Sequence, residues 1–226
     1  MNSGEIKPSF DELRTGFTAA VSHELRTPLA RILALLDSST LPGADMEALV
    51  DQARAEVENA GTLIDEILFL SELESGKEVV ALGHTNALPV LAEVLVEHED
   101  AAARAGVHLE ASGDPSVDLP LRPRMLRIVA ENLVENAIRY AGHGATFQFI
   151  VERDGAATLT AVDDGPGVSE ADLPRLFERF WRADAARASR GTGLGLAIVK
   201  HVVAAAGGTV EARGDRGLEV RCVFPG

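Results

Sequence analysis

The chain has 226 residues, of which 46% are hydrophobic and 25% are charged, a composition typical of a folded globular protein. Its formal net charge of −14 argues against nucleic-acid binding and against a basic patch that would hold it on a membrane. No segment approaches the roughly 20 apolar residues of a membrane-spanning helix, and no signal peptide opens the sequence. We therefore expect a cytoplasmic location, with any membrane anchor in upstream segments outside this chain. The single cysteine, Cys222, cannot form an internal disulfide and is expected to be buried in a strand.

Two long helices are predicted for the first 77 residues. They cover 9–37 and 46–76, and a Ser/Pro/Gly/Asp turn at 38–45 separates them. The second helix carries a narrow apolar stripe with alternating steps of four and three residues, typical of coiled-coil packing, and the first shows a similar stripe with one irregular step. The stripes comprise Phe17, Val21, Leu25, Pro28, Ile32 and Leu35, and then Met46, Val50, Ala53, Val57, Ala60, Ile64, Ile67 and Ser71. Two such hairpins would bury these stripes in a four-helix bundle, so we expect a homodimer.

Residues 78–226 change to a mixture of strands and helices, which predicts a separate α+β domain after the hairpin of 1–77. Strands are predicted at 79–82, 107–113, 146–155, 157–165, 208–213 and 217–224, and helices at 87–105, 123–141 and 193–206. The two strands at 146–155 and 157–165 are joined tightly at Asp154-Gly155, as in a hairpin. Residues 168–192 show little periodicity.

His23 is predicted to project from the first helix on the side away from the apolar stripe, because it lies about 200° from the nearest stripe residues. An exposed helical histidine usually has no function. Here an acid, Glu24, is adjacent and a hydroxyl, Thr27, follows one turn later. Pro28 removes a backbone hydrogen bond inside the helix and is expected to bend it. This combination indicates a site whose geometry must move.

The segment FTAAVSHELRTPLARI (17–32) resembles the phospho-acceptor box of sensor histidine kinases in two-component systems. The resemblance implies that His23 is the nucleophile that attacks the γ-phosphate of ATP through a neutral ring nitrogen. It implies that Glu24 orients the imidazole and accepts its other ring proton. Thr27 would position the water that dephosphorylates the partner protein in a reverse, phosphatase reaction.

Two segments of the second domain gather polar groups and glycines. In ENLVENAIRYA (131–141), Asn132, Asn136 and Arg139 share one helical face, although in isolation a plain polar face is the commoner explanation. DDGPG (163–167) ends a strand with glycines that let a ligand approach the backbone, but alone it is as easily a tight turn.

Two further segments follow. LFERFWRAD (176–184) is rich in aromatic residues, and such groups more often form a small core than a functional patch. GTGLGLAIVK (191–200) places glycines at the start of a helix, where free amides and the helix dipole suit phosphate. A dinucleotide-binding fold would need a strand directly before Gly191, and the preceding ADAARASR is not a strand, so that fold is excluded.

In this order, the four segments resemble the asparagine box, first glycine box, phenylalanine box and second glycine box of the histidine-kinase ATPase domain. That fold is shared with DNA gyrase, Hsp90 and MutL. With the histidine box, the resemblance covers the chain from about Phe10 to Phe224. It implies a helical hairpin, dimerising as a four-helix bundle, followed by an α+β two-layer sandwich with a mixed sheet that binds ATP and Mg²⁺.

The resemblance also implies roles for the residues of the asparagine box. Asn136 would ligate Mg²⁺, and Asn132 would support that shell. Arg139 would contact phosphate, with Tyr140 beside it. Catalysis would then consist mainly of positioning and charge neutralisation.

The glycine boxes would hold the base and the phosphates. Asp163 would accept a hydrogen bond from the adenine amino group, so GTP, which presents a carbonyl there, should be rejected. Gly165 and Gly167 would let the base sit close, and 168–190 would form a lid with Arg182 as a γ-phosphate contact. The remaining implied contacts are Gly191, Thr192, Gly193, Leu194 and Gly195, whose glycines would hinge the lid and offer amides to phosphate.

Two departures from the family pattern remove no chemical role. Asp164 stands where asparagine is commoner and adds negative charge near the site. LPLRPRMLR (119–127) replaces the usual Gly-Asp entry to the asparagine helix. We therefore expect an active enzyme.

The leading hypothesis is an ATP-dependent protein-histidine kinase that passes its phosphoryl group to an aspartate of a response regulator. An ATP-driven clamp of the gyrase, Hsp90 or MutL kind is one alternative, but it needs no His23-Glu24 pair. A catalytically weak dimeric scaffold is the other, and the intact Asn136, Asp163 and glycines count against it. Transfer within one chain or across the dimer would be decided by the handedness of the 38–45 turn.

Overall fold

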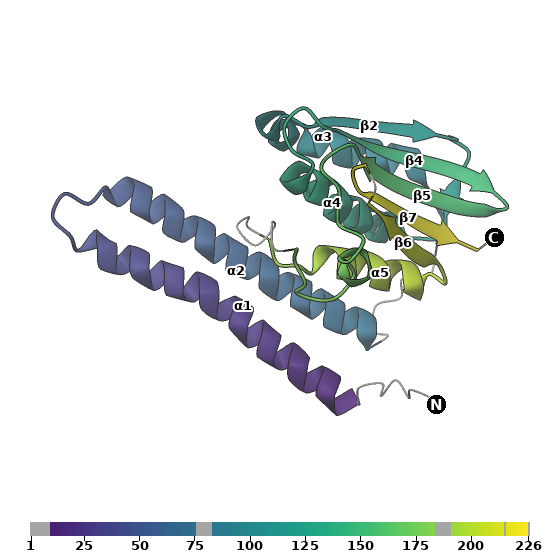
Figure 1. The fold of residues 1–226 in the computed structure, drawn as a ribbon. Coiled ribbons are helices and arrows are strands. Elements are labelled where there is room, and N and C mark those ends of the chain that lie inside the picture. Colours follow the sequence, from purple (N-terminus) through teal and green to yellow (C-terminus); the bar gives the residue numbers. More distant parts are fainter. Residues whose placement is uncertain (1–9, 76–82, 184–190, 215, 226) are drawn as a thin grey trace. The chain divides into compact units, whose positions relative to one another are not determined.

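The computed structural model describes residues 10–75, 83–183, 191–214 and 216–225, and it divides into two compact units, Met1–Leu68 and Phe69–Gly226 (Figure 1). Each unit is described by itself below. The predicted strand at 79–82 and the predicted domain boundary at residue 77 both fall outside the described residues. Among the helices that the described ranges contain, none is long and apolar enough to cross a membrane.

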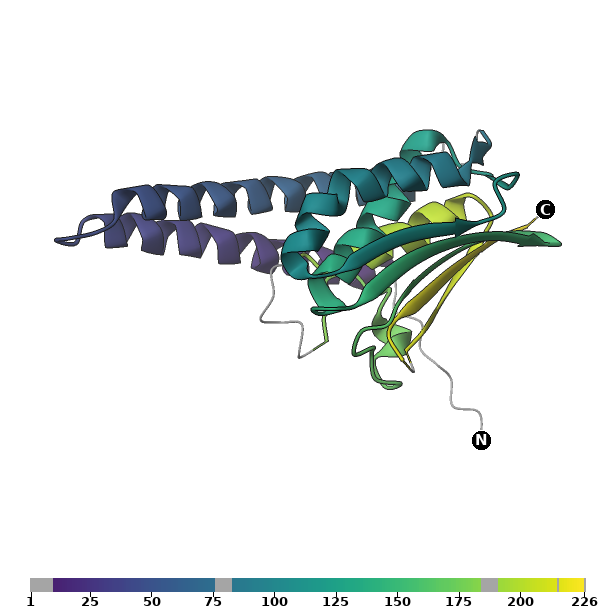
Figure 2. The same cartoon turned by 90° about the horizontal axis from the view of Figure 1, so that it is seen from above.

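The first unit is a helical hairpin. Helix α1 (Phe10–Ser39) and helix α2 (Met46–Glu74), which runs on past Leu68, confirm the predicted helices at 9–37 and 46–76 and lie side by side (Figures 1 and 2). Serine and threonine hydroxyls bond the last carbonyls of α1, with Ser38 Oγ donating to the Ala34 carbonyl at 2.7 Å. The Asp45 carboxylate accepts the Ala48 amide at 3.1 Å and so caps the start of α2.

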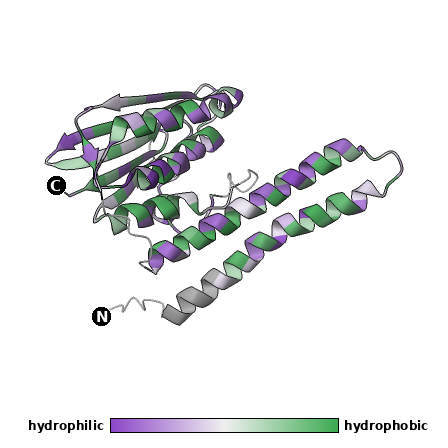
Figure 3. Cartoon of the chain, turned by 180° about the vertical axis from the view of Figure 1, so that it is seen from behind, coloured by the Kyte–Doolittle hydropathy of each residue, from purple (hydrophilic) through white to green (hydrophobic). Residues whose placement is uncertain are grey.

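The apolar surface of the hairpin is wider than the predicted stripes. Inside the hairpin Pro28, Leu63 and Glu56 are buried, and Glu56 accepts a hydrogen bond of 3.5 Å from Arg31. The predicted stripe of α2 splits, because Ala53, Ala60 and Ile67 are half-buried while its other five members are exposed in the single chain. Figure 3 shows hydrophobic and hydrophilic residues interspersed along α2 and along the coloured part of α1. The exposed apolar row comprises Leu29, Leu33, Leu36, Leu41, Met46, Val50, Val57, Ile64 and Leu68.

The second unit contains a mixed five-stranded sheet in the order β2-β4-β5-β7-β6. Strands β2 and β4 run parallel, and every other neighbouring pair is antiparallel. The strands are β2 (His108–Gly113), β4 (Thr146–Asp154), β5 (Ala156–Asp163), β6 (Thr209–Arg213) and β7 (Glu219–Phe224). A separate antiparallel pair, β1 (Thr85–Asn86) and β3 (Asp118–Leu119), was not predicted.

Three helices form a layer over one face of this sheet (Figure 2). They are α3 (Ala87–Ala105), α4 (Pro123–Tyr140) and α5 (Gly195–Ala205), and α4 contacts both of the others. Because the helices cover one face, β4 alternates buried and partly exposed residues, with Phe147 and Phe149 packed edge to face at 4.8 Å between ring centroids. The α+β prediction with a mixed sheet is therefore confirmed.

The start of α4 explains the unusual LPLRPRMLR entry. Pro123 opens the helix, and the preceding Arg122 is extended, with ψ of 155°. Proline suits the first helical position because its fixed φ matches the helix and its missing amide has no intrahelical partner there. This departure from the family pattern therefore preserves the helix that carries Asn132 and Asn136.

Candidate functional site

His23 lies on the surface of α1, with 75% of its side chain exposed. Its Nδ1 is 3.2 Å from Oε1 of the partly exposed Glu24. A carboxylate at this nitrogen favours the tautomer with a proton on Nδ1, which leaves the lone pair on Nε2. The predicted exposure of His23 is confirmed, and the ring nitrogen remote from Glu24 is the one able to act as a nucleophile.

The turn after His23 has weakened backbone bonding. Thr27 lies one turn on, and its hydroxyl donates to the carbonyl of His23 at 3.4 Å. Pro28 is buried and has no amide proton, so the carbonyl of Glu24 lacks its usual helical donor. His23, Glu24 and Thr27 thus sit on one short stretch of α1 whose helix is held by fewer hydrogen bonds than its neighbours.

Asn132 joins α4 to the start of α5. Its side-chain nitrogen donates to the carbonyl of Ile128 at 2.8 Å, so its amide oxygen faces away from its own backbone. A Cβ at Gly195 would come within 2.6 Å of that oxygen. Glycine at the first residue of α5 therefore lets the two helices meet at this point.

Asn136 lies one turn further along α4 and is half-buried. Across the described ranges its side-chain amide has no hydrogen-bond partner. An amide oxygen is a hard ligand of the type that Mg²⁺ accepts in company with phosphate oxygens. The residues present thus fit a magnesium–nucleotide group at this position.

Arg139 and Tyr140 complete the α4 face beside the glycine-rich segment. The Arg139 guanidinium lies 3.6 Å from the Glu135 carboxylate and 6.0 Å from the centroid of the Tyr140 ring. A Cβ at Gly191 would lie 3.0 Å from the Tyr140 hydroxyl and 3.4 Å from an Arg139 nitrogen. The end of α4 and the beginning of the glycine-rich segment are therefore neighbours.

The glycine-rich segment is tied to the aromatic segment. The amide of Phe180 donates to the carbonyl of Gly193 at 2.9 Å, and the Leu194 amide donates to Thr192 Oγ1 at 3.3 Å. Phe180 has φ of 60°, a strained value for a bulky residue, and such strain is common at functional sites. Arg182 is half-buried two residues later.

Asp163 is the last residue of β5, and two backbone amides donate hydrogen bonds to its carboxylate. Its Oδ1 accepts the amide of Gly165 at 2.9 Å and that of Leu218 at 3.3 Å. Burial raises the pKa of Asp163, and the two amide hydrogen bonds oppose that rise. A Cβ at Gly165 would come within 2.5 Å of the Ala141 carbonyl oxygen, so this loop packs against the end of α4.

Helix α4 is thus the common support of the site. It places Asn132 against Gly195, Arg139 and Tyr140 against Gly191, and Ala141 against Gly165. The asparagine box and both glycine boxes, predicted from separate segments, are brought together within the second unit. The contact of Leu218 with Asp163 was missed, because the two residues lie 55 positions apart.

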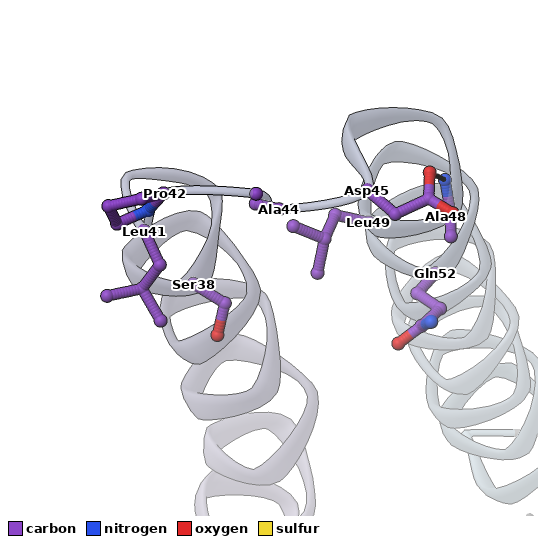
Figure 4. A pocket seen from close by; sticks show the side chains of 9 residues that line it. Ser38, Leu41, Pro42, Ala44, Asp45, Ala48, Leu49 and Gln52 are labelled. Atoms are coloured by element: carbon purple, nitrogen blue, oxygen red, sulfur yellow. Dashed lines mark hydrogen bonds between the residues drawn. The ribbon is translucent and has the colours of Figure 1, made fainter.

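A cavity of about 380 Å³ lies at the turn of the helical hairpin, and none of the predicted site residues lines it (Figure 4). Its lining is mostly apolar or small, with Leu41, Pro42 and Leu49 prominent. The one carboxylate in the lining belongs to Asp45, which is occupied in capping α2. This cavity therefore offers no chemistry for phosphoryl transfer.

Models of two protein families match segments of this chain. The model of the His Kinase A (phospho-acceptor) domain matches residues 13–76. The model of the histidine kinase-, DNA gyrase B- and HSP90-like ATPase matches residues 122–226.

Individual relatives agree. Sensor-like histidine kinase SenX3 of Mycobacterium tuberculosis (strain ATCC 25618 / H37Rv) is 34% identical over 204 residues, which cover 87% of this chain and 50% of SenX3. The structure of Acinetobacter baumannii histidine kinase AdeS has a TM-score of 0.76 and 25% identity, covering 90% of this chain and 97% of that one. Histidine kinase ThkA, solved in complex with response regulator protein TrrA, shares the fold with a TM-score of 0.73 at 21% identity, covering 93% of this chain and 61% of that one. The chain therefore spans about half the length of its curated relative SenX3.

Proposed function

Because the chain belongs to the sensor histidine kinases of two-component systems, we propose that it phosphorylates its own His23 with ATP and passes the phosphoryl group to an aspartate of a response regulator. One observation carries this proposal. The exposed His23–Glu24 pair occurs in the same chain as a nucleotide site assembled on α4. The solved complex of ThkA with a response regulator supports the same class of partner.

The proposed step on His23 is a displacement at phosphorus. The Nε2 lone pair forms a bond to the γ-phosphorus, the bond from that phosphorus to the bridging oxygen breaks, and ADP leaves with the electron pair. The Nδ1 proton lies between His23 and Glu24, whose carboxylate stabilises the positive charge that develops on the ring. Glu24 therefore acts both as an orienting group and as a counter-charge.

In the nucleotide site, each segment would hold a different part of ATP. Asn136 would give its amide oxygen to Mg²⁺, which when bound neutralises phosphate charge. Asn132 would support this shell, and Arg139 would contact a phosphate oxygen. The amides of the 191–195 segment would bind phosphate at the start of α5. Asp163 would accept a hydrogen bond from the adenine amino group.

The exposed apolar row of the hairpin supports a homodimer. A soluble single chain rarely presents so many large apolar side chains on one pair of helices. A second hairpin would bury them in a four-helix bundle, leaving His23 on the outside. Thr27, one turn from His23, would position water for the reverse dephosphorylation of the regulator. We propose a cytoplasmic site of action, with any membrane anchor supplied by other parts of a longer protein.

The proposal is tested with ATP radiolabelled on its γ-phosphate. Wild-type protein should acquire a label that is labile in acid and stable in base, whereas His23→Gln should acquire none and still bind ATP. Addition of the cognate receiver domain should remove the label from the kinase. Turnover of ATP without labelled protein would favour a clamp ATPase, and absence of both ATP binding and label would favour a scaffold.

A further inference from the structure

The turn between β6 and β7 contacts the Asp163 loop through its backbone. The amide of Asp163 donates to the Leu218 carbonyl at 3.0 Å, and the amide of Leu218 donates back to Oδ1 of Asp163 at 3.3 Å. The Gly165 amide donates to the same Oδ1 at 2.9 Å. One carboxylate oxygen therefore receives two backbone protons, and neither of these hydrogen bonds uses Oδ2.

Gly217 makes this approach possible. It is buried, has φ of 86°, and sits so close that a Cβ would overlap the carbonyl oxygen of Asp163. The same Cβ would lie 3.0 Å from the Cα of Asp164. No side chain fits at this position unless the turn and the loop separate.

We propose that Gly217 and Leu218 are positioning residues for nucleotide selectivity, because they hold Oδ1 of Asp163 and so present Oδ2 to the adenine amino group. This inference rests on the proposed role of Asp163 in binding adenine. With Oδ1 fixed, the carboxylate cannot rotate to accommodate another base. A guanine carbonyl in the same place would meet an immobile acceptor and be rejected.

The Leu218 amide also stabilises the ionised form of Asp163. Burial raises the pKa of Asp163, and the hydrogen bond from Leu218 lowers it. An adenine amino group donates a proton, so it needs the ionised carboxylate. Separation of the turn from the loop should therefore shift the loss of ATP binding to higher pH.

The test compares Gly217→Ala with Gly155→Ala in the full chain. Gly155 also has positive φ, at 73°, but a Cβ there would meet nothing within 4 Å. Both variants carry similar backbone strain, and only the first disturbs Asp163. Binding of AMPPNP and its guanine counterpart is measured by calorimetry across a pH series. We expect Gly217→Ala to lose about tenfold in AMPPNP affinity, to discriminate less against the guanine nucleotide, and to lose binding at higher pH. Gly155→Ala should match wild type in all three.

A wild-type measurement keeps the inference testable should Gly217→Ala not fold. In amide NMR spectra, the Leu218 and Gly165 protons should titrate together as Asp163 ionises, and both shifts should persist when AMPPNP binds. A Leu218 amide that does not follow this titration would overturn the inference, as would wild-type selectivity in folded Gly217→Ala. Asp163→Ala distinguishes a failure of this inference from a failure of the proposed function. Undiminished AMPPNP affinity in that variant would refute the proposed role of Asp163 in binding adenine.

Discussion

The Asp164 carboxylate accepts a hydrogen bond of 2.6 Å from the amide of Thr146, while the Asp164 amide donates to the Thr146 carbonyl at 3.2 Å. This double link fastens the end of β5 to the start of β4, directly beside Asp163. Asparagine, which is commoner here in the family, has a side-chain oxygen that can accept the same hydrogen bond. The departure at Asp164 therefore preserves a structural contact.

Two substitutions of Asp164 should distinguish the effect of its charge on stability from the effect of its hydrogen bond. Asp164→Asn should keep near-wild-type stability and AMPPNP affinity. Asp164→Ala should lower the free energy of unfolding by about 1 kcal/mol, because the Thr146 amide loses its acceptor. Denaturant unfolding measures both, with Asp154→Ala as an exposed control. Equal stability of the alanine and asparagine variants would contradict the structural role.

Glu24 should affect the rate of phosphorylation without affecting nucleotide binding. Removal of the carboxylate in Glu24→Ala frees the imidazole from its fixed tautomer, and we expect autophosphorylation to slow by about a hundredfold. Glu24→Gln should be intermediate, because its side-chain oxygen can still accept the Nδ1 proton. Rates are followed by incorporation of radiolabel at saturating ATP.

The matched control for Glu24 is Asp37→Ala, which removes another exposed acid from α1 and should leave the rate unchanged. AMPPNP affinity should be equal in all of these variants. A fall in affinity parallel to the fall in rate would show that Glu24 acts through the nucleotide and not through His23.

Long, periodic elements could be predicted from the sequence to within about two residues. Helix α3 matches its predicted range of 87–105, and the β4–β5 hairpin follows the alternation on either side of Gly155. The two-residue strands β1 and β3 were missed because a strand of that length has no period to detect. Periodicity also could not tell which apolar residues of α2 face α1 and which form the exposed row.

The candidate site, too, could be predicted only in part from the sequence. Its ligand-type residues could be located because they lie in short motifs with recognisable chemistry. Their convergence on α4 depends on contacts between distant segments, such as Asn132 with Gly195. Leu218 contacts the Asp163 carboxylate through its backbone amide, so the leucine side chain does not signal this contact in the sequence.

Cys222 should be inert toward thiol reagents in the folded protein. It lies in the middle of β7 with no exposed surface, and burial raises the pKa of its thiol to about 12. The reactive thiolate is therefore scarce and inaccessible at neutral pH. An aromatic disulfide reagent should label it only on unfolding, with the same denaturant midpoint as the loss of circular dichroism. Rapid labelling in native buffer would contradict the described packing, and Cys222→Ala supplies the blank.

The exposed apolar row should control dimerisation. Ile64 belongs to this row and is 44% exposed in the single chain. In a homodimer, Ile64→Asp would bury two carboxylates in the proposed bundle, one from each copy. We expect it to weaken the dimer by about 3 kcal/mol, which raises the dissociation constant roughly a hundredfold. The neighbouring exposed Asp65 offers the control Asp65→Asn. Sedimentation velocity over a dilution series measures both, and an unchanged dimer in Ile64→Asp would refute this interface.

Asp163 and Asp114 should respond to pH with opposite signs. Burial raises the pKa of Asp163 in the folded state, so folding favours its protonated form, and that stabilisation is lost as pH rises through the folded pKa. At neutral pH its ionised, half-buried carboxylate costs stability. Asp163→Asn should thus unfold at equal or higher denaturant concentration than wild type at pH 7, with the difference vanishing in acid.

The same Asp163→Asn variant should lose ATP binding, because an amide nitrogen would face the adenine amino group.

Asp114 is the opposite case, since hydrogen bonds from Ser116 lower its pKa. Its contribution is present above the unfolded pKa and is lost as pH falls through the folded pKa, so Asp114→Asn should be slightly less stable than wild type at pH 7 and equal to it in strong acid. Denaturant unfolding over a pH series measures both variants. A destabilised Asp163→Asn that still binds ATP would show that the carboxylate serves the fold and not the nucleotide.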